Sequence, residues 1–326
     1  MNRRAAGLRR GGAAAGTHGA GVREGDPGLG TSGVVAAGAV ASGVVASGVV
    51  AAGVSVGAGT VRAMRLATWN INSIRARTER AVAFLERSGV DVLALQETKC
   101  KDDQFPREPF EALGYEVVTH GFSQWNGVAV ISRVGVDAVE QGFPGMPTWG
   151  DPAAAEARAL GVTAGGVRVW SLYVPNGREI GDPHYAYKLD WLARLRDAAA
   201  GWLEADPAAQ VALVGDWNIA PLDTDVWDPA FFAGRTHVTP AEREAFAAIA
   251  GVGYTEVSRE HVPAEHTYTY WDYQQLRFPR NEGMRIDLTY ASPALAARVT
   301  GVTIERNERK GKAPSDHVPV VLEVAG

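Results

Sequence analysis

Carboxylate, amide and imidazole side chains follow or precede the apolar runs of this sequence at five places. The residues at these places are Asn70 and Asn72, Glu97, Asp216 and Asn218, Asp287, and the adjacent pair Asp316 and His317. A set this rich in oxygen ligands suits a hard divalent cation such as Mg²⁺ or Mn²⁺, and the scarcity of Cys and His argues against structural zinc. With one histidine beside it, the set indicates metal-assisted hydrolysis of a phosphoester, in which a carboxylate activates water and an imidazole donates hydrogen bonds to the phosphate.

Each of these residues alone has an ordinary structural explanation. An acidic residue just past a strand is often a helix cap or a turn residue, and a histidine next to an aspartate is often a surface pair. Their joint occurrence at five strand ends favours a functional site, because strand ends are where layered α/β folds present side chains to ligands. The spacing alone does not show that the five strand ends converge.

The elements that must position these residues are short apolar strands and amphipathic helices, all after residue 63. The hydrophobic pattern predicts strands at 64–69, 90–95, 115–119, 127–132, 167–173, 210–215, 284–291 and 318–324, and helices at 75–88, 185–204 and 240–250. The last helix has the clearest start signal, because Thr239 can cap it and Pro240 suits its first position. Strands and helices mixed in this way predict one layered α/β catalytic domain over 64–326.

Residues 1–63 form a low-complexity extension rich in Ala, Gly and Val, and 32–56 lack Leu, Ile and aromatic residues. Small side chains bury too little area to offset the entropy of ordering, so we expect this extension to be disordered. A signal peptide or membrane segment fits less well, because Glu24 and Asp26 separate most of the arginines from the apolar run. A third possibility is that the domain begins at Met64 and the sequence as written starts too early.

Composition and charge bound the function further. The chain has 326 residues, of which 46% are hydrophobic, and its single cysteine, Cys100, excludes a disulfide framework and suggests a reducing compartment. We therefore expect a cytoplasmic monomer without membrane association. The net charge of −5 by itself disfavours a nucleic-acid partner.

The charge becomes more negative when the extension is set aside. Residues 1–63 hold six arginines and two acidic residues, which leaves 26 basic and 35 acidic residues in 64–326 and a net charge of −9. A DNA-binding domain with this balance must confine its positive charge to a local face. The residues expected to form such a face are Arg75, Arg77, Lys99, Lys101, Arg280 and Arg285.

Seven short motifs follow one another from Met64 onward. They are Thr68-Trp-Asn-Ile-Asn-Ser-Ile-Arg-Ala-Arg77, Leu95-Gln-Glu-Thr-Lys99, Asn126-Gly-Val-Ala129, Tyr173-Val-Pro-Asn-Gly177, Gly215-Asp-Trp-Asn-Ile219, Arg285-Ile-Asp-Leu288 and Ser315-Asp-His317. In this order they resemble the exonuclease III family of apurinic/apyrimidinic (AP) endonucleases, within the endonuclease/exonuclease/phosphatase superfamily. The resemblance covers 64–326 and implies a four-layered α/β sandwich, with two packed β-sheets flanked by helices and one acidic pocket at the strand ends.

The resemblance also implies roles for individual residues. Glu97 is expected to be the principal metal ligand, within a metal-binding set of Glu97, Asn70, Asp216, Asn218, Asp316 and His317. Asp216 is expected to act as the general base, Asn218 to position the attacking water, His317 to contact the phosphate while Asp287 orients it, and Tyr173 to hydrogen-bond a phosphate oxygen. The residues expected to bind the substrate are Asn72, Lys99, Asn176, Trp271 and Arg285.

The function implied by the resemblance is a DNA repair nuclease dependent on Mg²⁺ or Mn²⁺. It would cut duplex DNA 5′ to abasic sites and act on 3′ ends as a 3′→5′ exonuclease and 3′-phosphatase or phosphodiesterase. Two alternatives remain at this point: a superfamily phosphatase acting on inositol phosphates or lipids, and a catalytically silent DNA-binding module. Trp217 and Asn176 stand at positions that differ among relatives, so the balance between AP-site and exonuclease activity stays open.

Overall fold

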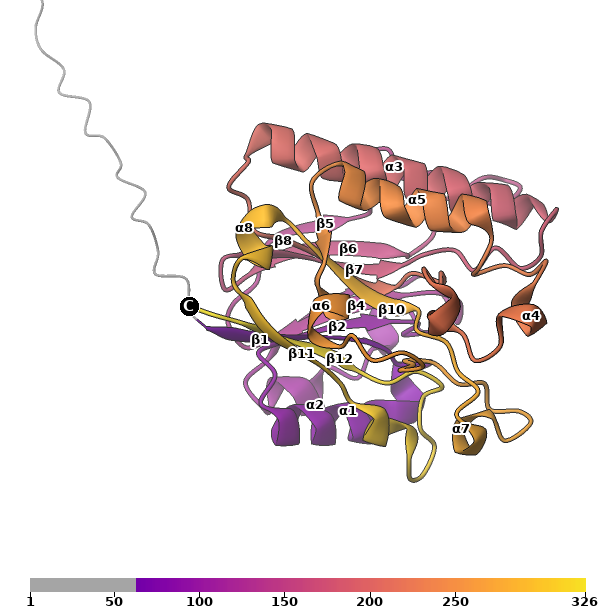
Figure 1. Cartoon of the computed structure of the whole chain (residues 1–326). Helices are drawn as coiled ribbons and strands as arrows, with labels where there is room; N and C mark the ends of the chain where they lie inside the picture. Colours follow the sequence, from indigo (N-terminus) through magenta and orange to yellow (C-terminus); the bar gives the residue numbers. More distant parts are fainter. Residues whose placement is uncertain (1–62) are drawn as a thin grey trace, which may run out of the picture. The chain divides into compact units, whose positions relative to one another are not determined.

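The computed structural model describes residues 63–326, so the prediction made for 1–63 lies outside the described residues except for Ala63. The domain contains two six-stranded mixed sheets (Figure 1). The first sheet has the order β11 (Val299–Ile304), β12 (Val320–Val324), β1 (Met64–Asn70), β2 (Val92–Gln96), β4 (Val128–Ser132) and β3 (Glu116–His120). The second has the order β5 (Asp137–Gln141), β6 (Ala159–Ala164), β7 (Val167–Tyr173), β8 (Val211–Asp216), β10 (Asp287–Ala291) and β9 (Thr255–Glu256).

Helices cover the outer face of each sheet. In Figure 1, α1 (Ile74–Ser88) and α2 (Glu108–Glu111) lie below the first sheet, and α3 (Pro183–Ala205) and α5 (Pro240–Gly251) lie above the second. Shorter helices occur in the connections: α4 (Pro229–Phe232), α6 (Val257–His261), α7 (Arg277–Arg280) and α8 (Pro293–Ala296). The two sheets and two helical layers confirm the predicted four-layered α/β sandwich.

Alternation along the strands fills the spaces between these layers. Val169 of β7 faces the core between the two sheets, whereas its neighbour Trp170 faces the core under α3, where Trp191 and Leu195 also pack. On the other side of the domain, Trp69 and Phe84 pack between the first sheet and α1. Large aromatic side chains therefore hold the helices to the sheets, and mostly β-branched residues fill the interior.

The start signal predicted for the last helix, α5, acts as expected. Thr239 accepts a hydrogen bond from the backbone N–H of Glu242, the Glu242 side chain accepts one from the backbone N–H of Thr239, and Pro240 occupies the first turn of α5. Helix α1 ends at Gly89, whose left-handed backbone (φ 62°) allows its N–H to reach the carbonyl of Leu85. The three predicted helices and eight predicted strands all occur, with bounds that differ from the predicted ones by at most three residues.

Four strands of the described domain were not predicted: β5, β6, β9 and β11. β5 is an edge strand whose side chains are largely exposed, and β9 has only two residues, so neither shows an apolar pattern. β6 and β11 each contain a glycine in the strand interior, which weakens the signal of a strand.

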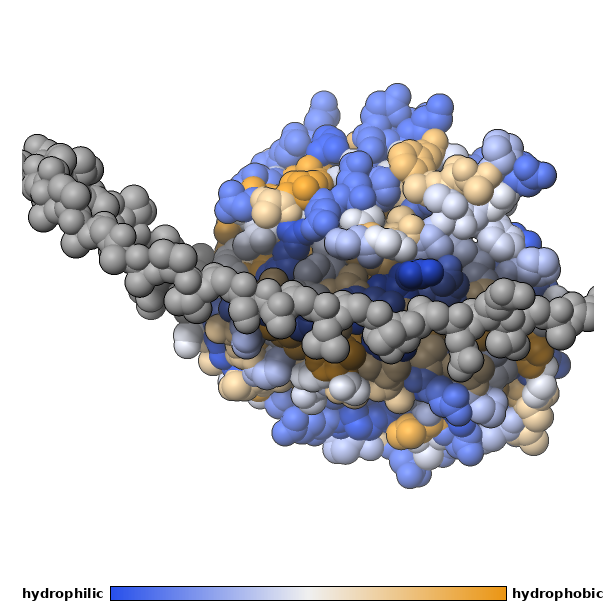
Figure 2. All heavy atoms as spheres, turned by 90° about the horizontal axis from the view of Figure 1, so that it is seen from above, coloured by the Kyte–Doolittle hydropathy of each residue, from blue (hydrophilic) through white to orange (hydrophobic). Residues whose placement is uncertain are grey.

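The surface adds little to the functional assignment. Figure 2 views the domain from the side of α3 and α5, where hydrophilic residues predominate and hydrophobic ones lie in separate spots. Among the described residues, no helix combines the length and apolar character needed to cross a bilayer.

Strand direction explains why the polar residues meet. β1 and β2 are parallel and end together, with Asn70 paired to Gln96, and β7 and β8 are parallel with Tyr173 paired to Asp216. β12 is antiparallel to β1, and β10 is antiparallel to β8 with Asp287 paired to Asp216, so both of these strands begin where the others end. The five polar strand ends predicted from the sequence therefore lie at one end of the sandwich.

Candidate active site

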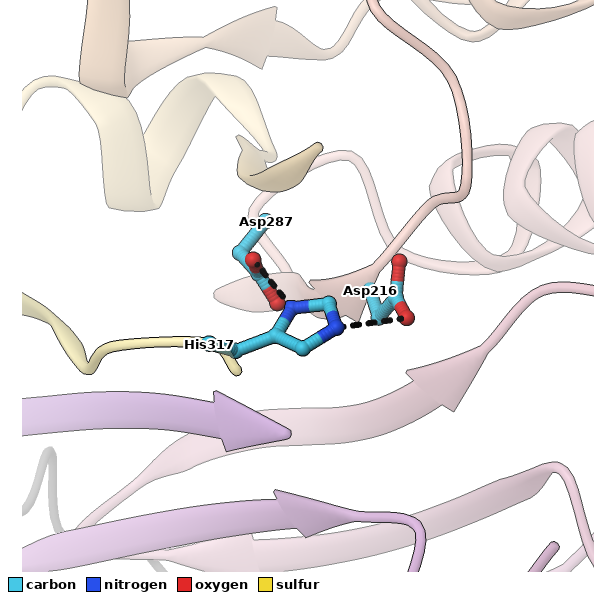
Figure 3. A group of neighbouring side chains, drawn as sticks. All are labelled: Asp216, Asp287 and His317. Carbon is cyan, nitrogen blue, oxygen red and sulfur yellow. Dashed lines mark hydrogen bonds and ion pairs between the residues drawn. The ribbon is translucent and has the colours of Figure 1, made fainter. Parts of the chain in front are cut away.

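A histidine between two aspartates lies at the centre of this end (Figure 3). Nδ1 of His317 lies 2.8 Å from Oδ2 of Asp287, and its Nε2 lies 3.8 Å from Oδ2 of Asp216. The indole of Trp69 donates to the backbone carbonyl of His317, which fixes the chain that carries the ring. Because Asp287 holds one ring nitrogen, the other is directed toward Asp216.

Asn70 joins the carboxylates of the two sheets. Its Nδ2 lies 2.9 Å from Oε1 of Glu97 and 3.0 Å from Oδ2 of Asp216. The second oxygen of Asp216 accepts a hydrogen bond of 2.9 Å from the backbone N–H of Asn218. Asn70 and Glu97 come from the first sheet, and Asp216 and Asn218 come from the second, so the site exists only when the sheets are packed together.

A second polar chain extends from Glu97 to Asp316. Lys99 Nζ lies 2.6 Å from Oε2 of Glu97 and 2.6 Å from Oδ1 of Asn72, and Asn72 donates to Oδ1 of Asp316 at 2.9 Å. Asp316 thus joins the site through Asn72. Lys99 and Asn72, both predicted to bind substrate, lie between two of the predicted metal ligands.

Several of these residues have an unusual backbone conformation. Asn72, Glu97, Lys99 and Asn218 all have positive φ, between 45° and 53°. Residues other than glycine seldom adopt this region, and they do so mostly where the surrounding structure enforces it, often at functional sites. Each of the four lies one to three residues past the end of a strand, where the chain turns.

Burial and charge shift the pKa values at the site in different directions. Burial, with Asp287 and Glu97 nearby, raises the pKa of Asp216 to about 7, although His317 opposes the shift. Burial alone would lower the pKa of His317, but the carboxylates of Asp287 and Asp216 outweigh it and raise that pKa to about 10. Burial alone would raise the pKa of Glu97, but Lys99 and Asn70 lower it. The site therefore combines an imidazolium with a carboxylate poised near neutral pH.

Two further predicted residues border this centre. Tyr173 ends β7 opposite Asp216, and burial together with the Glu97 carboxylate raises its pKa well above the usual range, so the phenol stays protonated. The exposed Asn176 donates from Nδ2 to Oδ1 of Asn218 at 3.0 Å. The structure thus brings together Asn70, Asn72, Glu97, Lys99, Tyr173, Asn176, Asp216, Asn218, Asp287, Asp316 and His317.

The remaining two predicted substrate-binding residues, Arg285 and Trp271, have fully buried side chains, which corrects the prediction for Arg285. The role of Trp271 stays a prediction, because its backbone N–H donates to the carbonyl of Asp316 at 2.9 Å, at the edge of the site. Arg285 is fully buried and donates to Ser258 Oγ and to the carbonyl of Val262, so it presents no surface to a substrate and drops out of the expected basic face. Trp271 is also fully buried and packs edge-to-face on Phe278.

Tyr270 is the residue that sequence reasoning missed beside Trp271. Its ring centroid lies 4.9 Å from that of His317, and its backbone pairs with both Met284 and His317. Adjacent residues of an extended segment point to opposite sides, so when Trp271 faces the interior, Tyr270 faces the site. The alternation in the segment 268–273 was the available signal.

His237 is a second residue that was missed. Its Nε2 lies 3.1 Å from Oδ1 of Asn218 and 3.2 Å from Nδ2 of Asn176. Burial and the charge of Lys188 lower the pKa of His237 to about 3, so the ring is neutral. Its backbone φ of 80° is left-handed. No pattern in the sequence predicts that His237 belongs to the site, because it lies in the irregular connection between α4 and α5.

The donor set fits a hard divalent cation. Glu97 is ionised, it shares the Asn70 amide with Asp216, and all the neighbouring acceptors are carboxylate or amide oxygens. The other possible ligand cluster in the described residues, Asp216 with Asp287 and His317, suits a cation less well because both aspartates already face the imidazolium. Glu97 faces the Lys99 ammonium in the same way, so its role as the principal metal ligand stays a prediction.

Comparisons with known proteins agree with this geometry. The sequence model of the endonuclease/exonuclease/phosphatase family matches residues 67–317. Exodeoxyribonuclease III of Haemophilus influenzae is 30% identical over 275 residues, covering 80% of this chain and 99% of that protein. A buried site of acidic residues, amides and one histidine at the joined ends of two sheets defines a phosphoester hydrolase of this family.

Solved structures place the chain more narrowly. The 3′-5′ exonuclease NExo of Neisseria meningitidis superposes with a TM-score of 0.76 and 33% identity, covering 81% of this chain and all of that one. An AP endonuclease of Archaeoglobus fulgidus gives a TM-score of 0.74 and 32% identity, covering 80% of this chain and 99% of that one. The chain belongs to the exonuclease III family within the endonuclease/exonuclease/phosphatase superfamily, and it is a nuclease. The alternatives of an inositol-phosphate or lipid phosphatase and of a silent binding module are therefore set aside.

Proposed function

We propose that this protein is a DNA repair nuclease that uses Mg²⁺ to hydrolyse phosphoesters at 3′ ends and 5′ to abasic sites in duplex DNA. The observation that carries the proposal is the convergence on Asp216. The Asn70 amide and the His317 ring approach one of its carboxylate oxygens, and the backbone N–H of Asn218 holds the other. This geometry suits attack of water on a phosphate held beside the imidazolium.

Each polar group then has a defined task. Asp216, with a pKa raised to about 7, accepts a proton from the attacking water as the new O–P bond forms and the bond from phosphorus to the leaving oxygen breaks. The leaving oxygen then takes a proton from solvent water. His317, kept protonated by Asp287, donates a hydrogen bond to a phosphate oxygen and stabilises the negative charge that develops there. Tyr173 donates from its phenol to a second phosphate oxygen.

Glu97 would hold the metal, with Asn70, Asp216 and Asp316 as the neighbouring oxygen donors and Asn218 and His317 near them. Bound there, the cation would supply Lewis-acid stabilisation of the phosphate charge. Mn²⁺ has similar ligand preferences and is the expected substitute.

The range of substrates is proposed from the relatives. NExo has also been solved as a 3′ phosphatase bound to a product DNA hairpin, and the relative from Archaeoglobus fulgidus is an AP endonuclease. Both are about equally similar to this chain, so neither activity is favoured by similarity. One site can serve both, because each reaction is attack of water on a phosphoester. Removal of a base also weakens stacking, which lowers the cost of extruding an abasic nucleotide into a pocket.

The test uses two duplex oligonucleotides, one with an internal abasic-site analogue and one with a 3′-phosphate at a nick. With Mg²⁺ present, we expect incision of the first and release of inorganic phosphate from the second, with EDTA abolishing both. The variant that combines Asp216→Asn with His317→Ala should lose both activities. Cleavage of neither duplex by the wild-type protein, or full activity of this double variant, would contradict the proposal.

A further inference from the structure

A buried ion pair lies behind the Asn176 and Asn218 side of the site. Lys188 of α3 and Glu242 of α5 both have fully buried side chains, and Lys188 Nζ lies 2.5 Å from Oε1 of Glu242. Such a pair is weak evidence for stability, because the cost of taking two charges out of water offsets much of their attraction. Its hydrogen bonds indicate a different role.

The ammonium group of Lys188 connects two loops of the site. An ammonium has three N–H donors, and three acceptors surround this one. Besides Glu242, it donates to the backbone carbonyls of Asn176 at 3.2 Å and Asn218 at 2.7 Å. The stem of Lys188 also packs against Gly177, where an added Cβ would lie 3.1 Å from Lys188 Cδ. Lys188 therefore fixes the start of the loop after β7 and the start of the loop after β8.

Glu242 holds a third loop to the same point. Its Oε1 accepts the backbone N–H of His237 at 2.9 Å, and its Oε2 accepts the backbone N–H and the hydroxyl of Thr239 at 3.1 and 2.8 Å. Both carboxylate oxygens are thus fully used. The His237 ring, positioned in this way, contacts the amides of Asn176 and Asn218.

The ion pair also reaches the centre of the site through one more step. Lys188 holds the carbonyl of Asn218, and the N–H of the same residue donates to Oδ1 of Asp216 at 2.9 Å. A change in the orientation of Asn218 would therefore move the hydrogen bond that orients Asp216. Displacements of about 1 Å in such groups are enough to cost large factors in rate.

We propose that Lys188 and Glu242 are positioning residues, which fix Asn176, Asn218 and His237 as one polar unit and thereby orient Asp216. This inference rests on the proposed nuclease function of the site. Neither residue contacts the substrate, since both side chains are fully buried. Loss of the pair should therefore lower kcat and leave KM for DNA nearly unchanged.

The decisive variant replaces both members of the pair by apolar residues of similar size, as Lys188→Met with Glu242→Leu. Exchanging a buried ion pair for packed apolar side chains is often neutral for stability, so this protein should fold. The backbone carbonyls of Asn176 and Asn218 nevertheless lose the ammonium group that donates to them. We expect kcat on the 3′-phosphate duplex to fall at least 10-fold, while KM changes less than 3-fold.

A matched control breaks another ionic contact in the same domain. Asp91 precedes β2, at the opposite end of the strand from Glu97, and lies 3.0 Å from Arg133. Asp91→Asn should lower the unfolding temperature without changing kcat. If the apolar double variant fails to fold, Glu242→Gln replaces it as the test, because it keeps the shape and loses only the charge and one acceptor. Glu242→Gln should lower kcat at least 3-fold.

A measurement without substrate separates this inference from the proposed function. Amide hydrogen exchange of the DNA-free protein should accelerate at 174–178, 217–220 and 236–239 in the Lys188 and Glu242 variants, and stay at the wild-type rate there in Asp91→Asn. Wild-type kcat and wild-type exchange in a folded Lys188 or Glu242 variant would overturn the inference. A wild-type protein that cleaves neither duplex would instead overturn the proposed function, and the exchange result would still decide about the ion pair.

Discussion

At the residue scale, Asp216 shows how a single carboxylate can serve activity at the expense of stability. Burial, together with Asp287 and Glu97, raises its pKa to about 7, so the ionised form is disfavoured in the folded protein. Asp216→Asn removes that charge and keeps the shape. We expect kcat to fall about 1,000-fold, the order of magnitude that a general base contributes.

The same substitution should raise the thermal stability of the metal-free protein, because a costly buried charge is lost. Differential scanning calorimetry in EDTA measures this change. Asp197→Asn, at an exposed position on α3, is the control and should alter neither kcat nor the unfolding temperature. A less stable Asp216→Asn protein in EDTA would contradict the argument.

The pair of His317 and Asp216 also predicts how stability depends on pH. Both have pKa values raised in the folded protein, to about 10 and about 7. Each raised pKa means that the folded state binds protons more tightly, so the stabilisation present at low pH is lost as pH rises through these values. The metal-free protein should lose on the order of 5 kcal/mol of unfolding free energy between pH 6 and 10.

Urea unfolding in EDTA at several pH values measures that loss. Asp287→Asn removes the carboxylate that hydrogen-bonds to Nδ1 of His317, so it should flatten the dependence. Asp197→Asn should keep the wild-type slope. An unfolding free energy that increases from pH 6 to 10 in the wild-type protein would show that the two groups are not coupled as described.

At the element scale, periodicity was enough to predict the strands and helices that carry the site. The runs ending at Asn70, Glu97 and Asp216 are mostly apolar, since both faces of these strands are largely buried. The capping residues of α5 were equally clear. The edge strand β5 was not predicted, because its side chains are largely exposed and its sequence therefore lacks the apolar pattern from which strands are predicted.

The side-chain direction within irregular segments was not predictable in the same way. Whether Tyr270 or Trp271 faces His317 depends on the backbone pairing of Tyr270 with Met284, a contact between segments distant in sequence. Arg285 looked like a DNA contact because of its charge, yet Ser258 and Val262 satisfy it in the interior. Lys188 gave no signal, because one lysine in an amphipathic helix is ordinarily exposed.

Gly215 makes a prediction at this scale. Its φ is 151°, and an added Cβ would lie only 1.9 Å from the carbonyl oxygen of Leu172 on β7. Gly215→Ala should therefore push β8 away from β7 and displace Asp216, which is the next residue. We expect a loss of about 3 kcal/mol of unfolding free energy, as for other overpacked sites, and a lower kcat at temperatures where the variant is folded.

Gly201→Ala is the matched control for this substitution. Gly201 lies in α3 with open space around the added Cβ, so alanine should stabilise the helix by about 0.5–1 kcal/mol. Urea unfolding compares the two variants. Equal stability of Gly215→Ala and the wild-type protein would mean that β7 and β8 tolerate a wider separation than the structure indicates.

At the scale of the whole molecule, the site depends on packing between two similar halves. Each sheet contains one parallel pair joined across a helix, β1-α1-β2 in the first and β7-α3-β8 in the second. The first pair supplies Asn70 and Glu97, and the second supplies Asp216. The two strand-helix-strand units lie in separate segments of the sequence. The spacing of residues along the chain therefore could not show that the ends of their strands converge. Only the resemblance to a known family predicted that convergence before the structure did.

Net charge gives the last prediction. The described domain is strongly acidic, so attraction to DNA must come from a few exposed cations, such as Arg75 and Lys312. Arg75 and Lys312 line one groove of about 470 Å³ with Arg77 and Arg80. Each phosphate contact contributes about −0.9 to the slope of log affinity against log salt. With roughly four or five contacts, the slope should lie near −4.

Fluorescence anisotropy with a labelled duplex and Ca²⁺ in place of Mg²⁺ measures that slope. Arg75→Gln should weaken binding and reduce the magnitude of the slope by about 1, as expected for loss of one phosphate contact. Arg194→Gln is the control. Arg194 lies on the exposed face of α3, which covers the second sheet, whereas Arg75 lies on α1, which covers the first. This substitution should change neither the affinity for DNA nor the slope. A slope steeper than about −7, which corresponds to eight contacts, would show that DNA covers far more of this acidic domain than its exposed cations allow.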